Sequence, residues 1–349
     1  MPAPRATRPA TRGATRRAAR RTAIALAGLA GLLATACGAS YTAPAEVALP
    51  PEVTVAPPPT VQTRECDNND PALLAISSYD PDLVVTPPGQ FAPGSYMAQI
   101  QQSGKLRVGT SIDTQLFAAV NPATNEIEGF DVDIAKLVAL AIFGGSWKDI
   151  GQRLDLQGIT YAQRIPSLED RSVDLVAHTM TINCTRWSRV GFSTVYYDAG
   201  QKILVRSDSP VTSIDELQDN RAQICAPAGS TNIDELAKYP GLQVTAVDDI
   251  TDCLVLFQQG KVEAITADDT VLAGFADQDP YAKVVGVAFT SEPYGIAANK
   301  DDVDLIRFVN GVLAAARADG EWKAIYERWL GEFGATPEPP VADTSRPPG

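Results

Sequence analysis

The chain has 349 residues, of which 45% are hydrophobic and 20% charged, and its formal charge is −13. That length predicts two domains with room for real cores, and a mean hydropathy near zero excludes a disordered or fibrous chain. The 42 acidic residues outnumber the 29 basic ones, so the chain would repel phosphates and we expect no nucleic-acid partner. His178 is the single histidine, which argues against a multi-histidine metal site, and we expect neither a metal nor a cofactor.

Residues 1–36 resemble an export signal. They hold seven arginines and no acidic residue, and they end in the apolar run Thr22–Ala36. A basic stretch before a short apolar run is typical of a secretory signal, and the run is shorter than the roughly 20 residues of a membrane span. The segment Leu33–Cys37 resembles a bacterial lipobox, with Ala34 where leucine is usual. We therefore expect cleavage before Cys37, diacylation of its sulfur and an anchor on the outer face of the cell membrane; an ordinary secretory signal is the alternative.

The composition changes along the chain predict its organisation. Residues 37–63 are rich in Ala, Pro, Val and Thr, which predicts an extended tether that cannot bury a core. Residues 64–103 form an N-terminal extension, and the proline-rich residues 334–349 are expected to be a disordered tail. Once the seven N-terminal arginines are set aside, 22 basic residues face 42 acidic ones, so the rest of the chain carries a formal charge of −20.

Four further cysteines follow Cys37, namely Cys66, Cys184, Cys225 and Cys253. An even number of cysteines in an exported protein favours two disulfides, which could pair in three ways. The C-x₂-C spacing of a metal site is absent from the sequence.

Predicted strands and helices alternate from residue 106 onward. The predicted strands are, in order, 106–109, 154–159, 173–176, 202–205, 222–226, 262–266 and 294–298. The predicted helices are one capped by Asp131, then 165–169, 214–217, 232–239, 251–259, 301–317 and 321–330. This alternation predicts an α/β architecture in two units, each with a sheet whose carboxyl ends offer a ligand crevice.

Polar residues gather where three of these strands end. Thr179, Thr181 and Arg186 follow the 173–176 strand, and an arginine there could grip a carboxylate with two hydrogen bonds. Ser230 and Thr231 stand at the predicted start of a helix, where hydroxyls and free N–H groups bind anions.

Asp268 ends the 262–266 strand and could bind an ammonium group. Two carboxylate-binding places and one ammonium-binding place match the zwitterionic end of an amino acid. Signatures of common enzymes, such as a Walker A loop or G-x-S-x-G, are missing from the sequence. The residues therefore indicate a binding protein.

Five segments recur in order in the polar-amino-acid-binding proteins of ABC importers, which this chain resembles over about 106–333. They are Gly129–Ala135, Met180–Arg186, Phe192–Tyr197, Ala228–Thr231 and Gly260–Asp268. The resemblance is to family 3 solute-binding proteins, in the branch that binds glutamate, aspartate and glutamine. It implies a two-lobe periplasmic-binding-protein fold of type II, with the ligand in the cleft between lobes.

The resemblance also implies roles for residues. Arg186 would grip the ligand's α-carboxylate, helped by Thr181 and by the hydroxyl and N–H of Thr231, while Asp268 would take the α-ammonium and Thr179 would add its carbonyl or hydroxyl.

The same resemblance implies three further ligand-binding residues, Arg164, Asp113 and Phe117. Arg164 would contact a side-chain carboxylate, and Phe117 would cover the aliphatic part of the ligand. Ser111, near Asp113, stands where some glutamate/aspartate binders have a second arginine, which admits amides as well as acids.

Each of these residues also has a plain structural alternative. Arg186 could be a surface salt-bridge partner, Asp268 a helix cap and Arg164 a solvated charge. His178 is expected to be structural. A second group of acids is expected to form a solvated face: Asp248, Asp249, Asp252 and Asp269.

The fold implies lobe closure as the mechanism. Lobe 1 would comprise 104–197 and 294–333, lobe 2 would comprise 200–290, and two crossings near 198–201 and 291–293 would join them. The closed form would deliver glutamate, aspartate or their amides to a membrane permease. Two alternatives remain: a sensor that signals through a membrane protein, and a cyclohexadienyl dehydratase that uses Asp268 as its acid.

The resemblance finally bears on the disulfides. Glutamate-binding relatives look to have cysteines at the places of Cys225 and Cys253, which implies that these two pair, and Cys66 and Cys184 are then left as the second pair.

Overall fold

The computed structural model describes Cys66, residues 74–81 and residues 90–347. The predicted signal, the tether and the lipidation site Cys37 lie outside the described residues. Within them, the chain folds around two five-stranded mixed sheets.

The first sheet has the strand order β5-β1-β6-β15-β7. Its strands are β1 Leu106–Thr110, β5 Leu154–Gly158, β6 Leu175–Val176, β7 Val190–Phe192 and β15 Ala297–Asn299. Strands β5, β1 and β6 are parallel, whereas β15 runs antiparallel to both of its neighbours. The carboxyl ends of β1 and β6 therefore meet at one edge of the sheet, and the loops with Asp113 and Thr179 start there.

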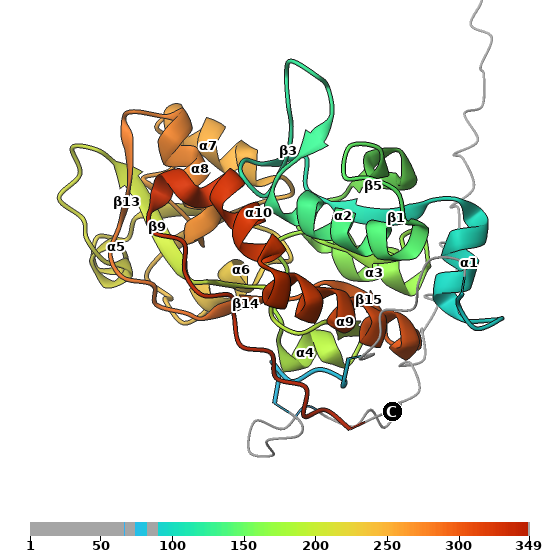
Figure 1. Ribbon diagram of the computed structural model, residues 1–349. Helices are drawn as coiled ribbons and strands as arrows, with labels where there is room; N and C mark the ends of the chain where they lie inside the picture. Colours follow the sequence, from blue (N-terminus) through green and yellow to red (C-terminus); the bar gives the residue numbers. More distant parts are fainter. Residues whose placement is uncertain (1–65, 67–73, 82–89, 348–349) are drawn as a thin grey trace, which may run out of the picture. The chain divides into compact units, whose positions relative to one another are not determined.

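Helices cover this sheet and supply its core (Figure 1). They are α1 Tyr96–Ser103, α2 Phe130–Phe143, α3 Arg164–Glu169, α4 Cys184–Trp187, α9 Val303–Asp319 and α10 Glu321–Leu330. Ile134 and Val138 of α2 pack with Phe308 of α9 and Trp322 of α10 in one buried cluster. The apolar positions of α2 recur every three to four residues, so one face of the helix meets the sheet.

The second sheet has the order β11-β10-β12-β9-β13. Its strands are β9 Gln201–Arg206, β10 Gln223–Pro227, β11 Gln243–Val247, β12 Ala264–Asp268 and β13 Ala282–Val285. The helices around it are α5 Ile214–Asp219, α6 Thr231–Leu236, α7 Ile250–Gln258 and α8 Asp269–Gln278. Two buried clusters pack against it, one that includes Phe257 and Phe275 and one that includes Ile224 and Leu236.

The chain crosses between the sheets through an antiparallel pair of strands, β8 Tyr197–Ala199 and β14 Glu292–Tyr294. The resemblance implies crossings near 198–201 and 291–293, and these ranges overlap the two strands. The expected strand 294–298 is split, because residues 295 and 296 separate β14 from β15. The remaining elements are the small sheet β2 Asp113–Thr114, β3 Ala118–Val120 and β4 Ile127–Glu128, and the 3₁₀ turns η2 Ile150–Arg153, η3 Tyr161–Gln163 and η4 Gly331–Phe333.

Both expected disulfides are present. Cys225 of β10 is bonded to Cys253 of α7, and Cys66 is bonded to Cys184 of α4. The first bridge joins a buried strand to the helix that packs on it. The second ties the N-terminal extension to the helix that carries Arg186.

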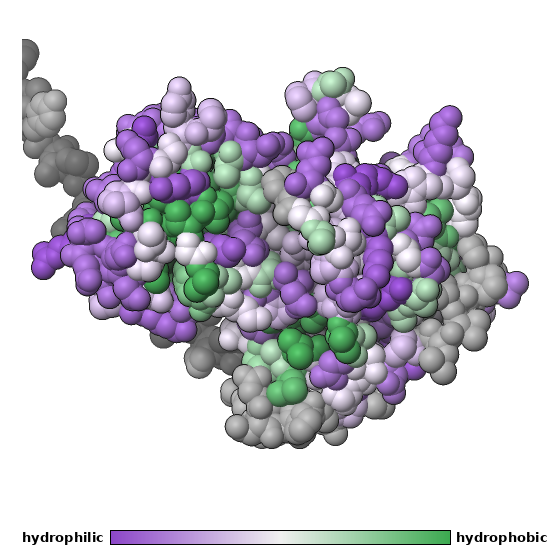
Figure 2. All heavy atoms as spheres, turned by 60° about the vertical axis from the view of Figure 1, so that its left-hand side comes forward, coloured by the Kyte–Doolittle hydropathy of each residue, from purple (hydrophilic) through white to green (hydrophobic). Residues whose placement is uncertain are grey.

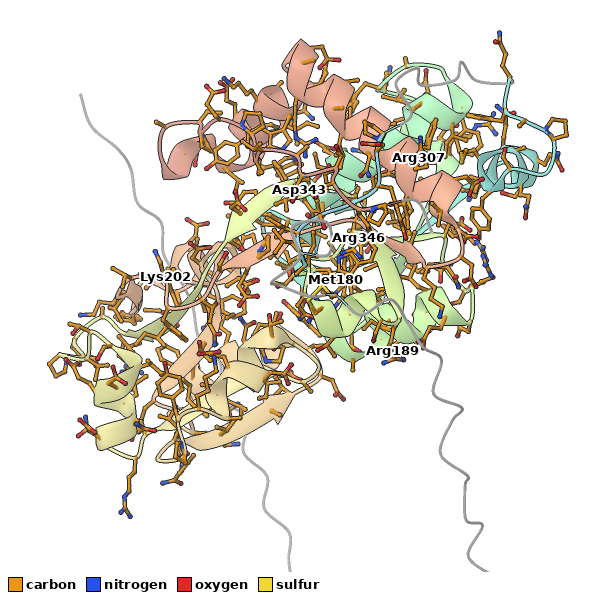
Figure 3. The ribbon with its side chains drawn as sticks, turned by 90° about the horizontal axis from the view of Figure 1, so that it is seen from below. Met180, Arg189, Lys202, Arg307, Asp343 and Arg346 are labelled. Carbon is orange, nitrogen blue, oxygen red and sulfur yellow. A yellow bond between two sulfur atoms is a disulfide. The ribbon has the colours of Figure 1, made fainter. Side chains whose placement is uncertain are left out.

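The C-terminal segment differs from its prediction. The sequence predicts a disordered tail over 334–349, but the structure pairs Arg346 with Tyr79 in a β-bridge and buries the arginine to 8% exposure. Figure 1 shows this last segment passing α4, and Figure 3 places Arg346 with Met180 and Arg189 rather than with Lys202 of β9. The proline content is no guide here, because one arginine finds backbone acceptors and an aromatic ring on the N-terminal extension and α4.

Polar residues predominate on the face drawn in Figure 2, and they interrupt its hydrophobic patches. Among the described residues, no helix combines the length and the apolar character needed to cross a bilayer. The described part of the chain also contains no cluster of three or more His, Cys, Asp or Glu side chains arranged to hold a metal ion.

Candidate ligand-binding site

Arg186 is held at the end of a tight turn. Asn183 caps the four-residue helix α4 by accepting a hydrogen bond from the Arg186 N–H at 2.9 Å. The guanidinium is buried at 7% exposure, and its Nη1 donates to the Thr181 carbonyl at 2.6 Å. Burial lowers the pKa of Arg186, an effect opposed by the acids Glu292 and Asp268. The surface salt-bridge alternative for Arg186 is therefore wrong.

Thr179 lies at the base of the same loop in a strained conformation with φ of 41°. Asp131 holds it there by accepting from the Thr179 N–H at 2.7 Å and from the Tyr196 hydroxyl at 2.7 Å. The Thr179 hydroxyl is buried and has no hydrogen-bond partner among the described residues, so this hydroxyl is available to a ligand.

Asp131 therefore has a different role from its prediction. The sequence predicts a helix cap, but Gly129 occupies the cap position and Asp131 is the second residue of α2, fully buried. The prediction did not include the contact of Asp131 with Thr179, because the two residues are 48 positions apart in the sequence. Burial raises the pKa of Asp131 to about 7, against the two hydrogen bonds, which lower it.

The turn between β10 and α6 approaches the 3₁₀ turn η3, which follows β5 of the first sheet. Gly229 has φ of 75°, and a Cβ there would lie 2.8 Å from the Cα of Ala162, so the turn requires glycine. Ser230 caps α6 by accepting from the Ile233 N–H at 3.1 Å, and its hydroxyl donates to the Pro227 carbonyl at 2.7 Å. Its only proton is thus committed inside the turn, contrary to the predicted anion-binding role of Ser230.

Thr181 lies in the loop after β6 of the first sheet, Thr231 begins α6 after β10 of the second sheet, and the two side chains meet. Their hydroxyl oxygens are 3.3 Å apart, and both lie 2.7 Å from Oε2 of Glu292. The two loops that the sequence singles out for carboxylate binding are therefore next to each other.

Glu292 is a further residue of this region that the sequence did not predict. It is buried at 3% exposure on the crossing strand β14, and its Oε1 accepts from the Thr290 hydroxyl at 2.6 Å. Nothing in its local sequence signals a contact with Thr181 and Thr231, which are more than 60 residues away. The one available signal was its position on an expected crossing between the lobes, which would place it near the cleft.

Asp268 faces the same region from the end of β12. Its Oδ1 accepts from the Asn232 amide at 2.7 Å, and its Oδ2 accepts from the Tyr294 hydroxyl at 2.6 Å. It precedes α8, but its side chain makes no cap hydrogen bond, so the helix-cap alternative is wrong. Burial, followed by repulsion from Glu292, raises the pKa of Asp268 to about 7. A buried carboxyl of this kind can take up a cationic partner.

Arg164 is buried at 2% exposure, so the solvated-charge alternative is wrong. Its Nε donates to the Tyr161 carbonyl at 3.0 Å and its Nη2 to the Gly229 carbonyl at 3.1 Å. Its Nη1 donates to the His178 and Thr179 carbonyls at 3.2 and 3.4 Å. It therefore links the loops of the two sheets. Burial lowers its pKa to about 9, and the guanidinium keeps at most one Nη2 hydrogen for a ligand.

Asp113 and Phe117 lie on or beside the small β2–β3 hairpin. The Asp113 Oδ2 accepts from the Thr251 hydroxyl at 2.6 Å, which ties the hairpin to α7. Phe117 is fully buried, with its ring edge-on to those of Tyr197 and Tyr294 at 5.1 and 6.0 Å between centroids.

His178 is structural, as expected. Its Nε2 lies 3.0 Å from the Ile159 carbonyl, and burial together with the charge of Arg164 lowers its pKa to about 3, so the ring is neutral. Together with Asp113, Tyr161 and Asp249 it lines a pocket of about 170 Å³. Asp249 is thus part of a pocket wall and not only of a solvated acidic face.

Comparison with known proteins identifies the fold and the family. The profile of the bacterial extracellular solute-binding proteins, family 3, matches residues 106–332. Among solved structures, the P235GK mutant of ArgBP from T. maritima is 32% identical to this chain, with a TM-score of 0.61. The match covers 67% of this chain and 99% of that structure's chain. An ancestral arginine-binding protein bound to glutamine is 31% identical, with a TM-score of 0.59. That match covers 65% of this chain and 98% of the other chain.

Two curated relatives are similar over most of their length. The ABC transporter glutamine-binding protein GlnH of Bacillus subtilis strain 168 is 34% identical over 237 residues, or 68% of this chain and 85% of that protein. The glutamate-binding protein GluB of Corynebacterium glutamicum is 31% identical over 257 residues, or 72% of this chain and 86% of that protein. Because these are solute-binding proteins and not enzymes, the dehydratase alternative falls away. The chain belongs to the bacterial extracellular solute-binding proteins, family 3, and has their type II periplasmic-binding-protein fold.

Proposed function

We propose that this protein captures L-glutamine, L-glutamate or their shorter homologues outside the cell, between lobe 1 (104–197 and 294–333) and lobe 2 (200–290). One observation carries the proposal: the hydroxyls of Thr181 and Thr231, which follow strands of the two different sheets, lie 3.3 Å apart near the buried Arg186. A small anion placed there would touch both lobes at once. Binding would therefore favour the closed arrangement over an open one.

The zwitterionic end of an amino acid fits the charges of this region. Its α-carboxylate would lie against the guanidinium of Arg186 and the hydroxyls of Thr181 and Thr231, and its α-ammonium against Asp268. The unpartnered Thr179 hydroxyl would gain a hydrogen-bond partner. An ammonium beside Asp268 would also offset the mutual repulsion of Asp268 and Glu292 that helps to raise the pKa of Asp268.

The ligand side chain is proposed to be an amide or an acid of four or five carbons. The support is the relatives named for glutamine and glutamate and the one Nη2 hydrogen that Arg164 keeps. Because four backbone carbonyls already accept from Arg164, a ligand carboxylate is not needed to satisfy it. Acid and amide are therefore both expected to bind.

Calorimetric titration of the mature chain with each of the twenty amino acids tests this proposal. We expect a dissociation constant in the micromolar range or below, about −8 kcal/mol, for glutamine, glutamate or their shorter homologues. Binding of aromatic or cationic amino acids alone would contradict the assigned side-chain class. No binding of any amino acid would contradict the function itself.

We also propose that Cys37 carries a lipid and that the loaded protein delivers its ligand to an ABC permease. The sequence around Cys37 supports the anchor, and the relative named as an ABC transporter component supports the partner. Metabolic labelling with a radioactive fatty acid should mark the wild-type protein and not a Cys37→Ala variant. Uptake of the ligand should fall when the chain is deleted and return with the wild-type gene.

A further inference from the structure

The helix that carries Arg186 is too short to be stable by itself. Helix α4 has only four residues, Cys184–Trp187, and a single helical turn is unstable in water because its nucleation is costly. The position of Arg186 therefore depends on what α4 packs against. Its inner side is the turn capped by Asn183. Its outer side is covered by chain segments from both ends of the protein.

Three contacts hold α4 from outside. The first is the disulfide from Cys184 to Cys66. The second is a hydrogen bond of 2.6 Å from the indole N–H of Trp187 to the Ala75 carbonyl. The third is the guanidinium of Arg346, which lies 3.7 Å from the centre of the Trp187 ring. Both residues that flank the Thr185–Arg186 pair are thus fixed.

Arg346 is itself held in place by more than its ring contact. Its Nε donates to the Ser77 carbonyl and its Nη2 to the Leu74 carbonyl, both at 2.9 Å. Its backbone N–H donates to the Ser78 carbonyl at 3.0 Å. A planar guanidinium can stack on a ring and donate to two carbonyls at the same time, which a lysine cannot do.

The N-terminal segment is anchored to the rigid part of the fold. The Ser78 hydroxyl donates to the Phe192 carbonyl of β7 at 2.6 Å, and Asn310 of α9 donates to the Ser78 hydroxyl and the Tyr79 carbonyl at 2.9 and 2.7 Å. The segment that contacts α4 is therefore itself bonded to strand β7 and helix α9.

These contacts come from outside the part of the chain that matches the family. The match covers residues 106–332, whereas Cys66, residues 74–79 and residues 343–346 precede or follow it. Figures 1 and 3 show the last of these segments beside α4 and near Met180. The outer contacts are thus additions to the common fold, and they converge on the one helix that bears the candidate carboxylate-binding arginine.

We propose that Cys66, residues 74–79 and residues 343–346 form a clamp that positions Arg186, and that Arg346 is a positioning residue of the ligand site. The proposal rests on the proposed role of Arg186 in ligand binding. A guanidinium held in its binding geometry before the ligand arrives loses less freedom on binding, so the clamp raises affinity. Because every amino acid has an α-carboxylate, the clamp acts equally on every ligand.

The test compares Arg346→Ala, Arg346→Lys and a matched control, Arg189→Ala, in the full mature chain well below the melting temperature. Arg189 follows α4 closely but pairs with Glu169 on the surface and has no part in the clamp. We expect Arg346→Ala to weaken binding of glutamine and glutamate at least tenfold and by the same factor, Arg346→Lys to restore little of it, and Arg189→Ala to change it less than twofold. A lower melting temperature with unchanged dissociation constants would overturn the proposal.

A second measurement tests, in the absence of ligand, whether the clamp stabilises α4. Amide hydrogen exchange of residues 183–189 should be faster in Arg346→Ala and in the double variant Cys66→Ser/Cys184→Ser than in the wild type, while exchange in the second sheet is unchanged. Equal exchange of 183–189 in all three proteins would overturn the proposal. If the wild-type chain bound no amino acid, the proposed function would fail, and the exchange of 183–189 would still decide whether the clamp holds α4.

Discussion

The Thr231 hydroxyl donates to Oε2 of Glu292 at 2.7 Å, and the Thr181 hydroxyl donates to the same oxygen at the same distance. A hydroxyl has a single proton to donate. Each threonine therefore donates either to Glu292 or to the carboxylate of a ligand, and the chain's own carboxylate competes with the proposed ligand for both.

This competition predicts that Glu292→Gln binds the ligand more tightly than the wild type. The amide removes a buried negative charge beside the ligand's carboxylate while it keeps the shape of the side chain. We expect a gain of at least about fivefold, or ~1 kcal/mol, in calorimetric titration. The exposed Glu263→Gln serves as the control and should bind as the wild type does. A loss of affinity in Glu292→Gln would mean that Glu292 orients the threonines for the ligand.

Asp268 predicts a pH dependence of binding. Its pKa of about 7 in the ligand-free protein means that the carboxyl is partly protonated at neutral pH. A ligand ammonium needs the ionised form, so binding releases a proton and affinity should fall as pH drops below 7, by up to about tenfold per unit. Titrations at pH 5 to 8 test this, and Asp268→Asn should bind weakly with no such dependence. A flat profile for the wild type would contradict the ammonium role.

Asp131 predicts a pH dependence of stability in the ligand-free protein. Its pKa is about 7 in the fold and near 3.8 in the unfolded chain, so between these values the fold binds more protons than the unfolded chain. The contribution of Asp131 to the free energy of unfolding is therefore fully present below pH 4 and is lost as pH rises to 7. Urea unfolding at several pH values should show a steeper fall for the wild type than for Asp131→Asn. Identical slopes would refute this account of Asp131.

The bridge from Cys225 to Cys253 closes a loop of 28 residues by sequence separation. In the chain-entropy model this contributes about 3–4 kcal/mol to the free energy of unfolding. The double variant Cys225→Ser/Cys253→Ser should lose stability by that amount in urea unfolding. Peptide mapping without reduction should also recover the two linked pairs, and a Cys66–Cys225 peptide would contradict the structure.

Local sequence patterns were sufficient for much of this fold. The alternation of strands and helices and the polar loops at Thr179 and Thr231 follow from periodicity, and the family resemblance implied the two crossings and the disulfide of Cys225. These features depend on residues close in sequence or on motifs shared with relatives. Ser230 shows the limit of a motif, because its hydroxyl caps the helix that it begins.

Contacts between distant segments were not predictable. The sequence predicts Asp131 to be a helix cap, and only the fold shows its contact with Thr179. Glu292 belongs to no recognisable motif, and its contact with Thr231 is likewise known only from the fold. Arg346 sits in a proline-rich segment whose composition predicts disorder, yet it is buried by a segment some 270 residues away. Each of these roles is fixed by tertiary neighbours that no local pattern records.

Arg186 is proposed to hold the α-carboxylate of an amino acid between the lobes. Calorimetric titration of wild type, Arg186→Ala and the control Arg189→Ala with L-glutamine and L-glutamate decides this role. Removing one partner of a buried charged pair costs roughly 3–5 kcal/mol, so Arg186→Ala should lose both ligands by at least a hundredfold while Arg189→Ala keeps them. If Arg186→Ala bound either amino acid as tightly as the wild type, the proposed site would be wrong.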